Sequence, residues 1–124
     1  AISDWRIKKT QKNKIKKNNI RDIEFILNDD VLKNISSHKK KPKLVIGFSA
    51  ETKNLLKNTK KKLIEKGCDW ILANDVSPSS GTFGGDENSL HLAHEEGVES
   101  WERMTKTDAA QKLARRVSDF LEAA

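Results

Sequence analysis

One stretch of the chain has the pattern of a strand, a helix and a second strand. Residues 44–48 are the apolar run Leu-Val-Ile-Gly-Phe, and residues 69–73, Asp-Trp-Ile-Leu-Ala, form a similar run with four apolar residues. Runs that are apolar on both faces are typical of central strands in a parallel sheet. Ligand sites in such βαβ units lie at the carboxyl ends of the strands. The chain is therefore predicted to be an α/β protein with its site near residues 49–52 and 74–76.

The helix of this unit is predicted over residues 52–66. One helical face carries a continuous stripe, which consists of Leu55, Leu56, Thr59, Leu63 and Ile64. This spacing is that of an amphipathic helix, and Gly67 is the residue type that most often ends one.

The flanking segments have weaker patterns. Residues 1–5 resemble the end of a strand, residues 6–22 are expected to form a mobile basic loop, and residues 23–27 read as a short strand. Asn28 is then expected to cap a helix that runs through Ser36, with two aspartates in its first turn.

The C-terminal third is predicted to contain a loop, a hairpin and a closing helix. Residues 77–85 have the composition of a loop, and residues 89–94 and 98–104 can pair as a hairpin. Thr105 and Asp108 predict the start of a helix. Its buried face is expected to contain Ala110, Leu113, Ala114, Val117 and Leu121. The predicted class is a Rossmann-like three-layer open sheet, mostly parallel, with an antiparallel hairpin near the C-terminus, and we expect the domain to be incomplete.

The charge is unevenly distributed. Residues 1–66 contain 19 Lys and Arg and 7 Asp and Glu, whereas residues 67–124 contain 5 and 11, so the net charges are +12 and −6. A localised basic region indicates an anionic partner, which could be a nucleotide triphosphate or a nucleic acid. The sequence has no run of 18 apolar residues. A single cysteine, Cys68, fits a reducing compartment, so a cytoplasmic protein is expected.

Common signatures of phosphate and metal sites are missing from the sequence. It has no Walker A pattern and no glycine fingerprint between a strand and a helix. His91 and His94 have odd spacing and would face opposite sides of one strand, so no metal site is predicted. Cys68 is interpreted as a half-buried apolar residue rather than a nucleophile.

Several residues are candidates for binding an anion or a base. Asp4 is expected at a strand end, where a carboxylate can bind a ribose or an amine, and residues 14–17 (Lys-Ile-Lys-Lys) could fold over a polyphosphate. Phe48 could stack on a base or simply pack in the core. Lys62 and Lys66 are one helical turn apart and could reach a single anion.

These residues lie in motifs that occur in one order along the chain. The motifs are Ala-Ile-Ser-Asp-Trp-Arg at 1–6, Lys-Ile-Lys-Lys at 14–17, Gly-Phe-Ser-Ala-Glu-Thr at 47–52, Lys62 with Lys-Gly-Cys-Asp at 66–69, Ala-Asn-Asp-Val at 73–76, and Phe-Gly-Gly-Asp-Glu-Asn at 83–88. The sequence thereby resembles the C-terminal part of phosphopantothenate-cysteine ligase, the synthetase domain of the bifunctional coenzyme A biosynthesis flavoprotein family. The resemblance covers nearly the whole chain, residues 1–124.

The resemblance implies a function. Family members join 4'-phosphopantothenate to L-cysteine, usually with CTP and Mg²⁺, through an acyl-cytidylate that the cysteine amine attacks. It implies nucleotide-binding roles for Asp4, Lys14, Phe48, Lys62 and Lys66. Substrate-binding roles fall on Ala1, Asn74 and Asp75, Lys14 is the expected catalytic residue, and residues 16–22 would form a flap over the nucleotide. A homodimer is implied, and any FMN would belong to a separate decarboxylase domain.

Two departures from the family pattern affect these expectations. Residues 29–32 are Asp-Asp-Val-Leu where the family usually has Pro-Asp-Ile-Leu, so the helix entry is expected to differ. The family's N-terminal half has no counterpart here, so we expect the chain to be a fragment or part of a split or bifunctional protein, inactive alone. The alternatives are a non-catalytic basic module that binds nucleotides or nucleic acid, although nucleic-acid motifs are missing, and a degenerate relative that serves in oligomerisation.

Overall fold

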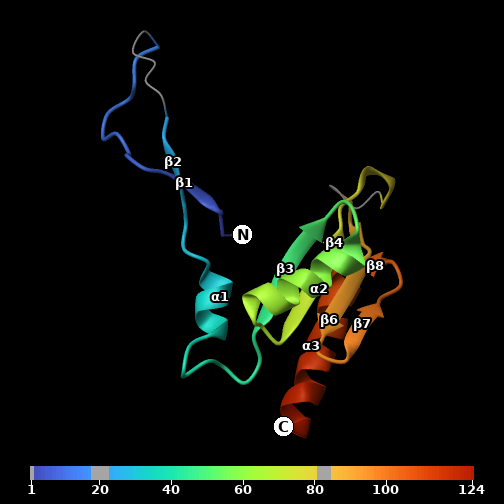
Figure 1. Ribbon diagram of the computed structural model, residues 1–124. Helices are drawn as coiled ribbons and strands as arrows, with labels where there is room; N and C mark the ends of the chain where they lie inside the picture. The colour runs from blue at the N-terminus through green and yellow to red at the C-terminus, as the bar shows by residue number, and fades with distance from the viewer. Residues whose placement is uncertain (1, 18–22, 81–84) are drawn as a thin grey trace. The chain divides into compact units, whose positions relative to one another are not determined.

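The computed structural model describes residues 2–17, 23–80 and 85–124. The chain divides into two units, residues 1–31 and residues 32–124, and each is described by itself. Figure 1 shows the order of the helices and strands along the chain.

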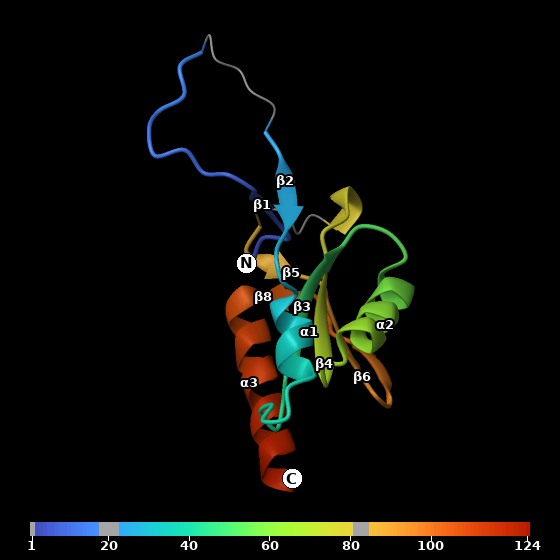
Figure 2. The ribbon, with the colours of Figure 1, turned by 60° about the vertical axis from the view of Figure 1, so that its left-hand side comes forward.

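The first unit contains a two-stranded antiparallel pair (Figure 2), formed by β1 (Trp5–Ile7) and β2 (Phe25–Leu27). Trp5 lies opposite Leu27 and Ile7 lies opposite Phe25, so these apolar side chains share one face. The predicted strand end at residues 1–5 is wrong, because β1 begins at Trp5 and Asp4 precedes it. Arg6 and Ile7 belong to β1 and not to the expected loop, whereas residues 8–17 contain no strand or helix. Ala1 and most of the proposed flap, residues 18–22, lie outside the described residues.

The first helix, α1 (Val31–Ser36), begins two residues later than predicted from a cap at Asn28. The Asn28 side chain is bonded elsewhere: its Nδ2 donates to the Ser3 carbonyl at 2.7 Å, and its Oδ1 accepts from Arg6 at 3.0 Å. The two aspartates therefore precede the helix instead of occupying its first turn.

The second unit is built on a four-stranded sheet with the order β3-β4-β6-β7. Its strands are β3 (Ile46–Glu51), β4 (Trp70–Asp75), β6 (Leu90–His94) and β7 (Gly97–Ser100). β3 and β4 are parallel, whereas β6 pairs antiparallel with both β4 and β7. The α/β class and the C-terminal hairpin are confirmed. The described sheet has one parallel pair, β3 and β4, because β6 pairs antiparallel with β4 and β7.

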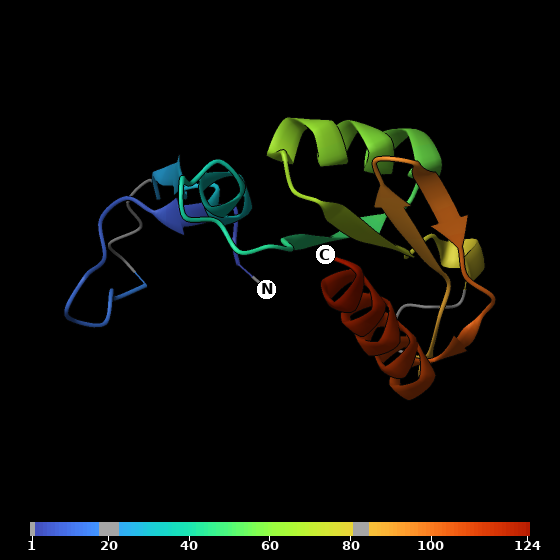
Figure 3. The ribbon, with the colours of Figure 1, turned by 90° about the horizontal axis from the view of Figure 1, so that it is seen from below.

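Helices cover both faces of this sheet (Figure 3), with α2 (Leu55–Lys66) on one side and α3 (Lys106–Ala123) on the other. On the α2 side, Leu63 packs against a buried cluster of Val45, Cys68, Ile71 and Ala93. On the α3 side, the buried cluster contains Trp70, Leu72, Leu90, Leu92, Trp101 and Ala109. The three-layer arrangement follows from strand alternation, since neighbouring residues in a strand point to opposite faces.

The ends of both long helices follow their sequence signals. Gly67 ends α2 in the left-handed region, with φ 65°, and its N–H donates to the Leu63 carbonyl at 3.0 Å. Thr105 caps α3, because its Oγ1 accepts from the Asp108 backbone N–H at 3.1 Å. The predicted last residue of α2 and the predicted start of α3 are confirmed, whereas α2 begins at Leu55 and not at residue 52.

The predicted buried face of α3 is partly wrong. Leu113 and Val117 pack against the core as expected, together with Ala109 and Phe120. The remaining three predicted residues are exposed, namely Ala110, Ala114 and Leu121. The Phe120 ring packs edge-on against Trp70, with ring centroids 5.3 Å apart, and this contact sets the rotation of the helix.

Short elements complete the described chain. They are a 3-10 turn at Pro78–Ser80 and an antiparallel pair of β5 (Glu87–Asn88) and β8 (Met104–Thr105). Arg103 connects them, because it donates to Glu87 Oε2 and to the Ser80 carbonyl, each at 2.7 Å. Among the described residues, no helix is both long enough and apolar enough to cross a membrane.

Candidate functional site

The carboxyl ends of β3 and β4 meet at one edge of the sheet. Glu51 lies opposite Asp75, and Ala50 lies opposite Asn74. The Val76 backbone N–H donates to the Glu51 carbonyl at 2.9 Å and holds the two strand ends together. The polar residues that follow the two apolar runs are thus adjacent, as the βαβ pattern predicts.

On the α2 face of this edge, a buried carboxylate faces a lysine. Glu51 is only 8% exposed, and Lys62 Nζ lies 2.5 Å from its Oε1. Asn58, one turn before Lys62 on α2, donates from Nδ2 to Glu51 Oε2 at 3.4 Å. Lys62 is therefore held in an ion pair with Glu51, whereas the sequence pattern predicted only that Lys62 and Lys66 could reach a single anion.

Asp75 is also bonded on this face. Its Oδ1 accepts from the Ser77 backbone N–H at 2.9 Å. Hydrogen bonds from the Ser77 hydroxyl and the Ser77 backbone N–H lower the pKa of Asp75, and His91 adds a smaller contribution in the same direction. Asp75 is therefore a carboxylate at neutral pH, with part of its hydrogen-bonding capacity already used by the loop that follows β4.

Phe48 and Asn74 belong to the other face of the sheet, because they alternate with Glu51 and Asp75 along their strands. The sequence pattern predicts that Phe48 ends its strand, but Phe48 lies within β3. It is 70% exposed, since β3 is the edge strand of the described sheet. Asn74 Oδ1 is buried and has no hydrogen-bond partner among the described residues. These two residues supply an exposed ring and an unsatisfied acceptor.

The remaining predicted site residues lie elsewhere in the chain. Lys66 is the last residue of α2, one turn from Lys62. Asp4 and Lys14 are exposed residues of the first unit, and the Asp4 carbonyl accepts from the Asn28 N–H at 2.8 Å. The structure thus brings Lys62, Asn74 and Asp75 to one edge. The proposed contribution of Asp4 and Lys14 to that edge stays a prediction.

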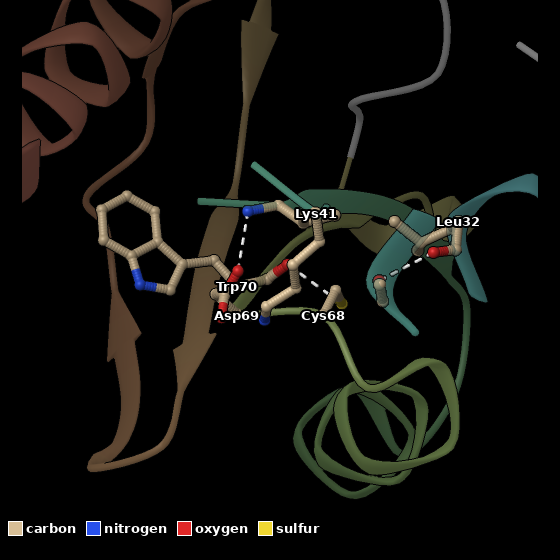
Figure 4. Close-up of polar contacts among 7 residues, drawn as sticks. Leu32, Lys41, Cys68, Asp69 and Trp70 are labelled. Carbon is tan, nitrogen blue, oxygen red and sulfur yellow. Dashed lines mark hydrogen bonds and ion pairs between the residues drawn. The ribbon is translucent and has the colours of Figure 1, made fainter. Parts of the chain in front are cut away.

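At the opposite end of β3 and β4, the polar contacts hold the fold together (Figure 4). The Asp69 carboxylate accepts from the Val45 backbone N–H at 2.8 Å and lies 3.1 Å from Lys41 Nζ. Beside it, the Cys68 thiol donates to the Trp70 carbonyl at 3.4 Å and is 7% exposed. Burial raises the pKa of the Cys68 thiol. The interpretation of this cysteine as an apolar residue is confirmed.

The histidines of β6 take part in pairwise contacts. His91 Nδ1 lies 2.9 Å from Ser100 Oγ, and His94 Nε2 lies 3.3 Å from Glu99 Oε1. Within residues 2–17, 23–80 and 85–124, no three His, Cys, Asp or Glu side chains gather as a metal-binding group.

Comparison with known proteins identifies the family. Residues 1–121 match the family described as DNA/pantothenate metabolism flavoprotein C-terminal domain. The chain belongs to this family. The resemblance inferred from its motifs is therefore confirmed, and the relatives below carry names from coenzyme A biosynthesis.

Two curated relatives illustrate the similarity. The chain is 32% identical to the coenzyme A biosynthesis bifunctional protein CoaBC of Borreliella burgdorferi over 118 residues, which cover 93% of this chain and 29% of the relative. It is 35% identical to CoaBC of Escherichia coli over 101 residues, covering 78% of this chain and 25% of the relative. The chain thus spans less than a third of these relatives.

Solved structures agree with the family assignment. The crystal structure of the C-terminal domain of CoaBC superposes with a TM-score of 0.74 at 29% identity, covering all of this chain and 53% of that one. The DNA/pantothenate metabolism flavoprotein from Streptococcus pneumoniae superposes with a TM-score of 0.62 at 16% identity, covering 83% of this chain and 45% of that one, and supports the fold alone.

Sequence reasoning missed three side chains of this edge. Glu51, Asn58 and Ser77 each bond a predicted site residue or its partner. A signal existed for Glu51, because a carboxylate directly after an apolar strand lies at the site edge of a parallel sheet. The spacing of residues along β3 could not identify Asn58 and Lys62 as the partners of Glu51, since both lie on α2.

Proposed function

We propose that this chain forms one wall of the nucleotide and substrate site of a phosphopantothenate-cysteine ligase. The observation that carries the proposal is the edge formed by β3 and β4, where the Lys62–Glu51 pair lies beside Asp75 on one face. On the other face, Asn74 Oδ1 is buried without a hydrogen-bond partner in the described part of the chain. Membership of the family supports it, because relatives are named for coenzyme A biosynthesis.

The reaction would proceed in two steps. The carboxylate of 4'-phosphopantothenate attacks the α-phosphorus of CTP and displaces pyrophosphate, which gives an acyl-cytidylate. The amine of L-cysteine then attacks the acyl carbon, loses a proton and displaces CMP, which leaves an amide. Neither step needs an oxidant or a flavin, so we assign any FMN to a separate decarboxylase domain.

Lysines would stabilise the charge that develops as pyrophosphate leaves. We assign this role to Lys14, with Lys62 and Lys66 binding the phosphates, because fixed cations act strongly where a transition state gains negative charge. Phe48, an exposed ring, would stack on the cytosine, and Asp4 would bind the ribose. We assign phosphopantothenate binding to Asn74 and Asp75 and, on the basis of the family resemblance, to Ala1.

Magnesium would enter this site with the nucleotide. Mg²⁺ is usually held by substrate phosphates and only one or two carboxylates. Ser77 and Lys62 already bond the carboxylates of Asp75 and Glu51, so a metal that takes most of its ligands from phosphates and water fits these residues. Bound there, it would neutralise phosphate charge. We also propose a cytoplasmic homodimer, on the basis of the family resemblance.

Nucleotide binding provides the direct test. The melting temperature is measured for this chain combined with the family's N-terminal half, because the chain is proposed to form only one wall of the site. CTP, ATP and a short nucleic-acid duplex are compared, each with Mg²⁺. We expect the largest increase with CTP. Equal shifts would remove the proposed preference for CTP, and a larger shift with the duplex would favour the alternative of a basic nucleic-acid-binding module, which the +12 charge of residues 1–66 motivates.

A further inference from the structure

Glu51 has an unusual environment for a carboxylate. It is 8% exposed at the end of β3, and two polar side chains of α2 approach it. These are Asn58 and Lys62, which lie four residues apart and so share one helical face. Leaving a buried carboxylate without its partner strongly destabilises a fold. The contacts of Glu51 with this face of α2 therefore hold the helix against the end of β3.

Lys62 is constrained by this contact but is not buried. Its side chain is 40% exposed, and its Nζ lies 2.5 Å from Glu51 Oε1. An ammonium group has three N–H donors, and one carboxylate oxygen occupies only part of that capacity. The pair thus presents an ordered ammonium group at the carboxyl edge of the sheet. An unpaired lysine would sample many rotamers there.

We propose that Glu51 is a positioning residue, which fixes the ammonium group of Lys62 so that it can bind the phosphates of the nucleotide. The inference rests on the proposed nucleotide site and adds a residue to it. Glu51 acts through Lys62 and does not contact the ligand. Glu51 also neutralises the charge of Lys62, so this pair attracts an isolated anion only weakly. A ligand whose phosphates reach further cations as well is therefore bound in preference to an isolated anion.

Competitive acylation of amines tests this arrangement in the full chain combined with the family's N-terminal half. An amine-reactive acetylating reagent is applied with and without CTP and Mg²⁺, and mass spectrometry measures the labelling of each lysine. An amino group held against a carboxylate reacts slowly, because it must leave the ion pair before the reagent can reach its nitrogen. We expect Glu51→Gln to raise the labelling rate of Lys62 at least about threefold, and CTP to protect Lys62 in the unchanged chain more than in the variant.

Glu65→Gln is the matched control. Glu65 pairs with Lys61 at 3.6 Å on the exposed side of α2, and such surface pairs contribute little. This variant should leave Lys62 labelling unchanged. If Glu51→Gln fails to fold, as judged by its melting curve, Glu51→Asp is used instead, because it keeps the charge but withdraws the carboxylate by one methylene and should give a smaller increase.

The outcomes separate the two proposals. Unchanged Lys62 labelling in the Glu51 variants would overturn the positioning role. Faster labelling in those variants, with no protection of Lys62 by CTP in the unchanged chain, would confirm the pair but refute the nucleotide site on which its role depends. Faster labelling together with protection supports both.

Discussion

Asp75 accepts a hydrogen bond from the backbone N–H of Ser77, with 2.9 Å between the nitrogen and Oδ1. This bond closes the turn directly after β4, where the candidate site lies. It makes the turn dependent on the ionisation of one carboxylate, since a protonated carboxyl is a poorer acceptor.

We expect the stability contributed by Asp75 to depend on pH. Hydrogen bonds from Ser77 lower the pKa of Asp75 in the folded chain. Stabilisation is therefore complete above the unfolded value, which is about 4, and is lost as the pH falls through the lower folded pKa. Urea denaturation from about pH 2.5 to about pH 7 should show that Asp75→Asn is less stable than the unchanged chain by an amount that shrinks below about pH 4.

Ser77→Ala is the control for this prediction. It removes the hydroxyl but keeps the backbone N–H, so the pKa of Asp75 measured by NMR should rise towards its ordinary value. A stability difference for Asp75→Asn that is constant with pH would contradict the assignment.

Two glycines should differ in why they resist substitution. Gly67 has φ 65° and open space where a side-chain Cβ would lie, whereas a Cβ on Gly47 would lie 2.5 Å from Leu32 Cδ2 and 2.6 Å from Ile71 Cδ1. We expect Gly67→Ala to cost about 1 kcal/mol, and Gly67→Asn less, because asparagine tolerates the left-handed region. Gly47→Ala should cost about 1–3 kcal/mol by overpacking. Chemical denaturation measures all three, and equal effects of Ala and Asn at residue 67 would argue against the conformational explanation.

Neighbouring residues of α3 should respond differently to truncation. Phe120 packs against Trp70, whereas Leu121 is 43% exposed. We expect Phe120→Ala to lower the free energy of unfolding by about 2 kcal/mol or more, and Leu121→Ala by less than about 1 kcal/mol. If thermal or urea unfolding showed a larger loss for Leu121→Ala than for Phe120→Ala, the buried face of α3 would be the one that the sequence pattern indicated.

Cys68 should be almost unreactive in the native chain. Its thiol is buried and its pKa is raised by that burial, and thiolates are the reactive form. A thiol-specific disulfide reagent should modify Cys68 at least about tenfold more slowly than a cysteine placed at the exposed position by Ser37→Cys. The comparison uses a Cys68→Ala background for the second thiol, and equal rates would show that the native thiol is accessible.

Local signals in the sequence predicted the elements that depend on neighbours along the chain. Gly67 and Thr105 set helix ends through their own backbone or hydroxyl, so they could be identified without the fold. The apolar runs before Glu51 and Asn74 likewise indicated two parallel strands and the edge where polar residues meet.

Contacts between distant segments could not be predicted in this way. Asn28 is a good cap in isolation, but its side chain bonds the Ser3 carbonyl, just before β1, and Arg6 within β1. On α3, the alanines at 109, 110 and 114 allow two neighbouring faces of the helix to be buried. The contact of Phe120 with Trp70 shows which of these faces packs on the core. The Glu51–Lys62 pair joins a strand to a helix, so no periodicity within either element reveals it.

The strand pairings also imply an order of assembly. In the β6–β7 hairpin, His94 lies opposite Gly97, whereas the parallel pair places Ile46 opposite Trp70. Closing a short loop loses less chain entropy than joining segments separated by a whole helix. We therefore expect the hairpin to form early in folding and β3 to join β4 late, so that the edge carrying Glu51 and Asp75 is completed only near the end of the folding reaction.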